Sequence, residues 1–197
     1  LAEAEVVALA IDMLDGCGLQ GYEVQIGHVG ILRDILIGLG LSQEGEPESP
    51  VASAMRLLDK GDWDRLTELF IANSIDSSAV EDLKKLSELD GGIETLDSAR
   101  EILSNMDVPL ESLDELASML SALDALAPTP PSLKVNLCVA RGLDYYTGMV
   151  FEVNVAGLGK EGQVLGGGSY RLLHLFGLED LDPSCGFGLG FDRVLLA

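Results

Sequence analysis

The sequence is poor in cysteine, histidine, aromatic residues and basic charge, and each shortage excludes a class of protein. Its 197 residues include three cysteines, Cys17, Cys138 and Cys185, without a C-x-x-C pair. We therefore expect neither a disulfide framework nor a zinc site, but buried thiols in a cytoplasmic protein. The two histidines, His28 and His174, are too few for a metal cluster, and we expect both to be structural.

The shortage of basic charge limits the partners of the protein. Only 12 basic residues stand against 33 acidic ones, which gives a formal net charge of −21. This balance argues against a broad surface for nucleic acids or anionic membranes. No apolar run reaches the length of a membrane span, and no basic segment followed by an apolar one marks an export signal. Hydrophobic residues make up 47% and aromatic residues 5%, so we expect a packed core that is mainly aliphatic.

Residues 42–130 differ in composition from the rest of the chain. They begin with a polar linker punctuated by proline and continue as short amphipathic segments at helical spacing. Ser49, Asp62 and Ser78 are expected to cap three of these helices. We predict an all-α insertion within one domain, which places the boundaries at 1–41, 42–130 and 131–197.

Outside this insertion, helical and strand-like patterns alternate along the chain. Short strands joined by hairpin-like, glycine-rich connections favour an antiparallel sheet over βαβ winding. The predicted fold class is therefore α+β. The predicted helices span 2–15 and 30–39, and the predicted strands span 22–26, 133–140, 149–155, 163–165 and 185–189.

The first stretch with candidate chemistry is RGLDYYTG, residues 141–148. It places a cation, a carboxylate and two phenols beside turn glycines. The guanidinium of Arg141 can clamp a phosphate or carboxylate with two hydrogen bonds, and Tyr145 and Tyr146 can hydrogen-bond a polar ligand. A hairpin with an Arg–Asp pair and core-packed tyrosines accounts for the same residues equally simply.

Two further stretches are rich in glycine. Gly166, Gly167 and Gly168 precede Tyr170 and leave a strand without side chains, which makes room for a planar ligand; a bulge or a bend is the alternative. The segment GFGLGFDR ends in Arg193 at an expected helix start. An arginine there can stack on a nucleobase, although an ordinary strand–helix junction explains it as well.

One motif match is not expected to be functional. Residues 157–162 fit the pattern G-x-G-x-x-G, but the residues after them form a poor helix. Because dinucleotide binding needs a helix immediately after this pattern, we do not predict it.

Taken together and in this order, the three stretches resemble the histidyl-tRNA synthetase family of class II aminoacyl-tRNA synthetases. Residues 141–152 are similar to its histidine-specific signature, residues 166–170 to its second signature, and residues 186–193 to class II motif 3. Residues 1–41 are similar to the segment after motif 2, and residues 42–130 fall where the family carries its insertion. The resemblance implies a class II synthetase-like antiparallel sheet with flanking helices.

The same resemblance implies an activity and the residues that perform it. The family attaches histidine to tRNA(His) through a histidyl-adenylate, using ATP with Mg²⁺, and its members are homodimers. Arg141 matches the catalytic arginine, which contacts the α-phosphate and the substrate carboxylate, and Arg193 matches the arginine that stacks on adenine. No metal ligand can be matched. The residues implied to surround the bound histidine are Tyr145, Tyr146, Gly166, Gly167, Gly168 and Tyr170.

Some family features differ or have no counterpart in the chain. Ser169 and Arg171 stand where many bacterial members carry Arg and Asp, which favours an archaeal-type member. Motifs 1 and 2 and the anticodon-binding domain find no match, so we expect a catalytic-core fragment that is inactive by itself.

Two other functions stay open at this point. The synthetase-like regulatory subunit of ATP phosphoribosyltransferase shares this architecture, but the intact 141–148 stretch favours the synthetase. Alternatively, residues 42–130 bind a partner protein. That segment carries 20 acidic and 6 basic residues, a net charge of −14, so we expect only weak, salt-sensitive contact with tRNA near Lys84 and Lys85.

Overall fold

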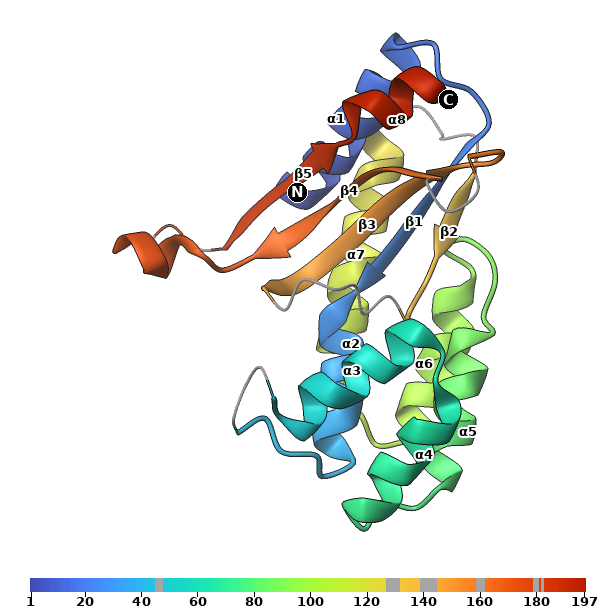
Figure 1. Ribbon diagram of the computed structural model, residues 1–197, viewed down its shortest axis with the longest axis vertical. Coiled ribbons are helices and arrows are strands. Elements are labelled where there is room, and N and C mark those ends of the chain that lie inside the picture. The colour runs from blue at the N-terminus through green and yellow to red at the C-terminus, as the bar shows by residue number, and fades with distance from the viewer. Residues whose placement is uncertain (45–47, 127–131, 139–144, 159–161, 179–180, 182) are drawn as a thin grey trace.

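A five-stranded sheet flanked by helices forms the centre of the molecule (Figure 1). The structure is a computed structural model that describes residues 1–44, 48–126, 132–138, 145–158, 162–178, 181 and 183–197. The strands run in the order β2-β1-β3-β4-β5. They span Tyr22–His28 (β1), Leu133–Val135 (β2), Tyr146–Val155 (β3), Gln163–Tyr170 (β4) and Ser184–Leu189 (β5).

The sheet is mixed, because one edge strand differs in direction from the others. Strands β1, β3, β4 and β5 pair antiparallel, as predicted, whereas β2 runs parallel to β1. The predicted strand 133–140 is too long, because β2 ends at Val135. Asn136 then accepts a hydrogen bond from the backbone N–H of Cys138 at 3.1 Å, which closes a local turn. Residues 139–140 lie outside the described residues.

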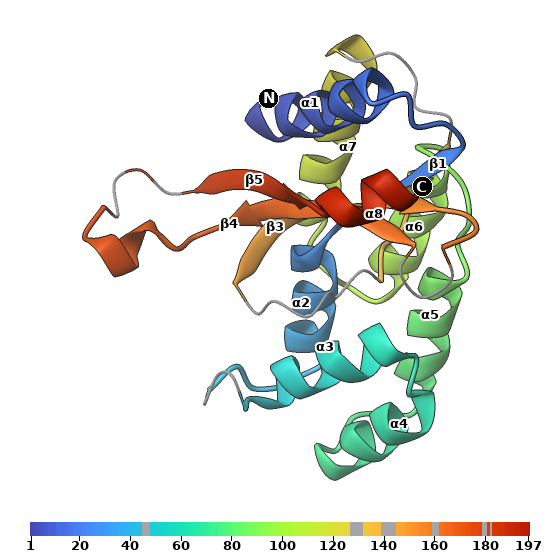
Figure 2. The ribbon, with the colours of Figure 1, turned by 45° about the horizontal axis from the view of Figure 1, so that its top comes forward.

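The helices lie on both sides of the sheet. Figure 2 shows α1 on one side and α2 and α3 on the other, and α7 also packs against α1 and β1. No helix in the described ranges is long and apolar enough to cross a membrane. The helices span Ala2–Gly16 (α1), Val29–Gly38 (α2), Pro50–Lys60 (α3), Trp63–Ala72 (α4), Ser78–Ser87 (α5), Thr95–Asn105 (α6), Glu111–Leu126 (α7) and Phe191–Leu196 (α8).

Two of the three predicted helix caps are confirmed. The Ser49 hydroxyl accepts from the Ala52 N–H at 3.1 Å, and Asp62 accepts from the Arg65 N–H at 3.3 Å. The cap predicted at Ser78 is wrong. That residue is the first of α5, and its own N–H donates to the Asp76 carboxylate at 2.7 Å.

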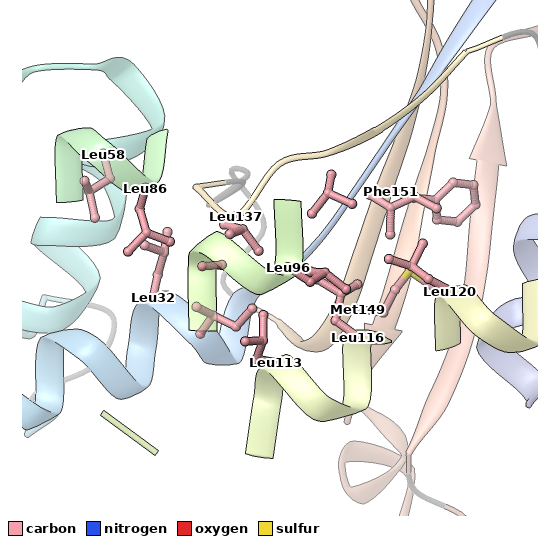
Figure 3. Packing of buried hydrophobic residues seen from close by; sticks show 14 of the residues in the cluster. Leu32, Leu58, Leu86, Leu96, Leu113, Leu116, Leu120, Leu137, Met149 and Phe151 are labelled. Atoms are coloured by element: carbon pink, nitrogen blue, oxygen red, sulfur yellow. The ribbon is translucent and has the colours of Figure 1, made fainter. Parts of the chain in front are cut away.

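The hydrophobic core is mainly aliphatic, as the composition predicts, and consists of one large cluster and a small second one at Val29 and Val150. The large cluster includes residues of α1, α7, the sheet and the helical region, and Figure 3 shows part of it between α7, the sheet and the helical region. In that figure, Met149 of β3 and Leu116 and Leu120 of α7 lie within the cluster. Helix α7 therefore links the predicted insertion 42–130 to the sheet, while the domain boundaries themselves stay a prediction.

The cysteines are less buried than predicted. Cys17 is exposed at the end of α1, so the expectation of a buried thiol is wrong there. Cys138 and Cys185 are partly buried, and burial raises the pKa of the Cys138 thiol to about 12. All three thiols are free.

Candidate functional site

The two faces of the sheet differ in chemistry. Alternate side chains of β3, among them Met149, Phe151 and Val153, belong to the core beneath α1 and α7. The residues between them face the other way. We call this second face the polar face; its cross-strand rows are Gln25–Glu152–Gly166–Gly188 and Gly27–Val150–Gly168–Gly186.

Three tyrosines from two separate stretches gather at one end of the polar face. The ring centroids of Tyr145 and Tyr146 lie 4.7 Å apart, and those of Tyr145 and Tyr170 lie 5.8 Å apart in an edge-to-face arrangement. Tyr146 and Tyr170 are also cross-strand partners of β3 and β4. The structure thus brings together the phenols of both predicted stretches.

Glycines make the space that these tyrosines occupy. A Cβ atom added to Gly168 would stand 3.0 Å from the Tyr146 ring, and one added to Gly186 would stand 3.6 Å from the Tyr170 hydroxyl oxygen. A side chain at Gly168 would therefore crowd the Tyr146 ring, whereas one at Gly186 would reach ordinary contact with Tyr170. At this end of the face, the glycines and tyrosines form one surface to which backbone and phenol hydroxyl groups contribute polar atoms.

Gly167 has a different environment from its two neighbours. Its cross-strand partners are Phe151 and Phe187, whose rings meet edge to face with centroids 6.2 Å apart. An added Cβ would lie 2.3 Å from the Gly186 carbonyl oxygen and 2.6 Å from the Phe187 Cβ. The missing side chain of Gly167 thus serves packing on the face beneath α1 and α7, so only its backbone is open to a role in the polar face.

The Tyr146 phenol is held in its neutral form. Burial raises its pKa, and a side-chain hydrogen bond with Tyr145 raises it further. A neutral phenol both donates and accepts hydrogen bonds at physiological pH, which suits the recognition of a small polar ligand.

Glu152 is a residue of this face that sequence reasoning missed. Its side chain is only 4% exposed, and its Oε1 accepts a hydrogen bond from the Gln163 side-chain amide at 3.1 Å. Buried carboxylates are rare unless they are paired. A lone acidic residue between Phe151 and Val153 in an apolar strand was the signal that could have identified it.

Arg193 lies at the other end of β4 from the tyrosines. Its Nη1 donates to the backbone carbonyl of Gln163, the first residue of β4, at 2.8 Å. Gly190, between β5 and α8, allows this approach, because an added Cβ would lie 3.3 Å from the Arg193 Cδ. The glycine-rich part of β4 therefore lies between Arg193 and the tyrosine cluster. Arg141, the predicted catalytic arginine, lies outside the described residues.

No metal site is evident in the part of the chain that the structure describes. Among those residues, no group of three or more His, Cys, Asp or Glu side chains is placed to hold a metal ion. Magnesium bound with a nucleotide uses one or two carboxylates together with phosphate oxygens and water. The described residues therefore assign no ligand to Mg²⁺.

The remaining candidates from the sequence have structural surroundings. His28 is the N-cap of α2 and accepts a hydrogen bond from the Gly30 N–H, which agrees with the structural role expected of it. Lys84 and Lys85 form ion pairs with acidic residues of their own helix. Residues 159–161 of the G-x-G-x-x-G match lie outside the described residues.

Comparison with known proteins places these features in a family. The family model described as histidyl-tRNA synthetase matches residues 1–194. A histidine–tRNA ligase from Methanosarcina acetivorans is 40% identical over 98% of this chain, and one from Archaeoglobus fulgidus is 39% identical over the same share. Both organisms are archaea. The chain spans 43% of the length of each relative.

Solved structures have the same fold. A histidyl-tRNA synthetase from Nostoc superposes with a TM-score of 0.82 at 19% identity, covering 99% of this chain and 46% of that one. A protein described as an ATP phosphoribosyltransferase regulatory subunit/histidyl-tRNA synthetase, from Bacillus halodurans, superposes with a TM-score of 0.76 at 25% identity. That match covers 99% of this chain and 49% of the other. The predicted fold class is confirmed, with the parallel edge strand β2 as an additional feature.

Proposed function

The chain belongs to the histidyl-tRNA synthetase family, and we propose that its polar face is the floor of the site where histidine is activated with ATP. In this proposal the longer protein that contains the chain, its full-length parent, attaches histidine to tRNA(His) through a histidyl-adenylate. The chain itself supplies part of the catalytic core and is inactive alone. The partners proposed for the parent are histidine, ATP, tRNA(His) and a second copy in a cytoplasmic homodimer.

The observation that carries this proposal is the meeting of three tyrosines over glycines at one end of β4. Tyr145, Tyr146 and Tyr170 bring their phenol groups together over the bare backbone of Gly168 and Gly186, and Gly166 lies next along the same face of β4. A histidine side chain is planar and carries a donor and an acceptor nitrogen, which phenol hydroxyl groups can satisfy. We therefore assign histidine binding to these residues, with Gly167 contributing through its backbone.

The nucleotide is assigned to the other end of the same strand. Arg193 is held there by the Gln163 carbonyl, so its guanidinium is already oriented before a ligand binds. A fixed guanidinium can stack on adenine and offset phosphate charge. Adenylate formation would then take place along the glycine-rich part of β4, between the two ligands.

Arg141 is assigned the catalytic role. When the histidine carboxylate attacks the α-phosphorus, negative charge grows on the phosphoryl oxygens and pyrophosphate leaves. A guanidinium fixed beside those oxygens stabilises the transition state more than the ground state. Mg²⁺ would neutralise part of the triphosphate charge when bound, and no step described here depends on a protein ligand to it.

The helical region 42–130 is proposed to be the insertion of the family. Its net charge of −14 and the pairing of Lys84 with Glu81 and of Lys85 with Asp82 leave little basic surface for a phosphate backbone. We therefore propose weak, salt-sensitive contact with tRNA.

The second candidate is a regulatory subunit without tRNA chemistry. The structural likeness to the Bacillus halodurans protein favours it as an alternative. The 37–40% identity to histidine–tRNA ligases favours the synthetase.

The test is histidine-dependent exchange of pyrophosphate into ATP by the full-length parent. We expect exchange in the wild type and a loss of about 10²- to 10³-fold in rate for Arg141→Ala. Arg65→Ala is the matched control, because Arg65 is an exposed arginine of α4 whose charged partner is Asp62. A parent without histidine-dependent exchange would favour the regulatory subunit, and full activity of Arg141→Ala would remove the assignment of that residue.

A further inference from the structure

The pairing of β3 with β4 is irregular directly beside the tyrosine cluster. Val150 pairs with Gly168 and Tyr146 pairs with Tyr170, so residues 147–149 of β3 stand opposite Ser169 alone on β4. The backbone ladder therefore determines the position of β4 less tightly here than elsewhere. Residues 166–168, directly before Ser169 on β4, are glycines and have no side chains to hold the strand in place.

A side-chain hydrogen bond lies at this irregularity. The Ser169 hydroxyl donates to Oε1 of Glu3, in the first turn of α1 and 166 residues away in the sequence. Ser169 is only 5% exposed, and Glu3 is partly buried. Hydrogen bonds to a charged acceptor are stronger than neutral ones, particularly when shielded from water.

Gly148 of β3 makes room for this contact. An added Cβ would lie 3.2 Å from the Ser169 Cβ and 3.4 Å from Oε1 of Glu3. Gly148 belongs to the first signature stretch and Ser169 to the second. The contact thus ties both stretches to α1 on the side of the sheet opposite the tyrosine cluster.

We propose that Ser169 is a positioning residue for histidine binding, acting through its hydrogen bond to Glu3. Side chains alternate along β4, so Ser169 faces α1 while Gly168 and Tyr170 face the polar side. Holding Ser169 against α1 therefore also determines where Gly168 and Tyr170 lie along β4 and how far they stand from α1. The bond thereby holds Tyr170 in contact with Tyr145 and above Gly186, where the proposed histidine site needs it.

The kinetic test rests on the proposed function and uses pyrophosphate exchange by the full-length parent. For Ser169→Ala we expect the KM for histidine to rise on the order of 10-fold, with the KM for ATP unchanged. Ser169→Thr retains the hydroxyl and should restore most of the affinity. Ser112→Ala is the matched control, because the Ser112 hydroxyl donates to Asp34 at 2.8 Å, joining α7 to α2.

A double-mutant cycle shows whether Ser169 and Glu3 act through one shared interaction or through two independent ones. Glu3→Ala should raise the KM for histidine as Ser169→Ala does, and the double variant should be no worse than either single variant. Additive effects, or a KM for histidine within twofold of wild type in Ser169→Ala, would overturn the proposal.

Amide hydrogen exchange tests the positioning without relying on activity. In the full-length parent, the segment 163–170 should exchange faster in Ser169→Ala and Glu3→Ala than in wild type or Ser112→Ala. If the parent shows faster amide hydrogen exchange in these variants but no histidine-dependent pyrophosphate exchange, then the positioning role holds and the proposed function fails. Unchanged exchange in both variants would overturn the positioning role, whatever the activity. If Ser169→Ala fails to fold, Glu3→Ala and Ser169→Thr decide the question by the same measurement.

Discussion

The ring of Tyr146 lies against the backbone of Gly168 on the neighbouring strand. A Cβ atom at Gly168 would stand 3.0 Å from the ring and 2.4 Å from the Met149 carbonyl oxygen, which belongs to the backbone and cannot easily move. Gly188 lies on the same face in the adjacent strand, where an added Cβ meets nothing within 4 Å. Gly168 is therefore required by the packing around it, whereas a larger residue can be tolerated at Gly188.

Gly168→Ala should therefore lower the free energy of unfolding by about 1–3 kcal/mol through overpacking. Gly188→Ala should change it by no more than about 0.5 kcal/mol, as expected for an open site. Denaturant unfolding of the full-length parent measures both. Equal midpoints for the two variants would show that the Tyr146–Gly168 contact is not tight.

Alanine substitution should mainly reduce stability at Gly167 and mainly reduce histidine activation at Gly166. At Gly167 the added Cβ meets backbone atoms of β5 at 2.3 and 2.8 Å, so Gly167→Ala should destabilise the fold by several times the ~0.5 kcal/mol typical of surface changes. At Gly166 it meets the end of the flexible Gln163 side chain at 2.7 Å, and the Phe151 carbonyl oxygen lies at an ordinary contact distance of 3.8 Å. Gly166→Ala should destabilise the fold less than Gly167→Ala, because the Gln163 side chain that hydrogen-bonds Glu152 can shift. It should weaken histidine activation, because its methyl group occupies the polar face. Thermal unfolding and the KM for histidine separate these effects, and a Gly167→Ala variant as stable as Gly166→Ala would refute the assignment.

How much of this arrangement the sequence predicts depends on how local the interactions are. Ser49 and Asp62 cap helices through N–H groups three residues away, so their roles follow from spacing alone. Ser78 has the same spacing signal, but it is the first residue of α5 itself, and its own N–H donates to the carboxylate of Asp76, which lies before the helix. Which of two nearby polar residues precedes the first helical turn depends on where the helix begins, and the spacing of residues does not contain that.

The candidate site shows the same division. The tyrosines and glycines can be found in the sequence because they are concentrated in short stretches. Which glycine faces which side depends on strand register, so the packing role of Gly167 between Phe151 and Phe187 could not be predicted. The contact between Ser169 and Glu3 depends on where α1 crosses β4, and no local pattern records that.

His28 provides a prediction for the pH dependence of stability. Its Nδ1 accepts from the Gly30 N–H at 3.2 Å, which requires an unprotonated nitrogen, and its Nε2 lies 3.2 Å from Oε2 of Glu115. Burial lowers the pKa of His28, although the carboxylates of Glu115, Glu3 and Asp34 act in the opposite direction. The net result is a pKa below the ordinary value.

The unfolded chain, in which the pKa of histidine is about 6.5, therefore binds more protons than the folded one in mildly acidic solution. Stability should fall as the pH drops below about 6.5, and His28→Gln should remove this part of the decline. Denaturant unfolding at several values between about pH 7.5 and 5.5 compares the two proteins. A variant that loses as much stability as the wild type over this range would contradict the prediction.

The helical region should show the stability of a packed core. Phe70 of α4 is fully buried, whereas its neighbour Ile71 is 63% exposed. Phe70→Ala should cost about 3–5 kcal/mol of unfolding free energy, and Ile71→Ala should cost about 0.5 kcal/mol or less. Denaturant unfolding of both variants in the full-length parent provides the comparison. Similar losses would mean that α4 packs with a different face toward the core.

The most direct test of the account compares tyrosines on the two faces of one sheet. Tyr146 and Tyr170 belong to the polar face, while Tyr22 of β1 is buried on the face beneath α1 and donates to Asp15 of α1 at 2.7 Å. The measurement is kcat/KM for histidine in pyrophosphate exchange by the full-length parent. Tyr146→Phe and Tyr170→Phe should each reduce it by about 3- to 10-fold, the effect of one lost hydrogen bond, while Tyr22→Phe should leave it unchanged. Wild-type values for both polar-face variants, or an equal loss in Tyr22→Phe, would contradict the claim that histidine is bound on this face.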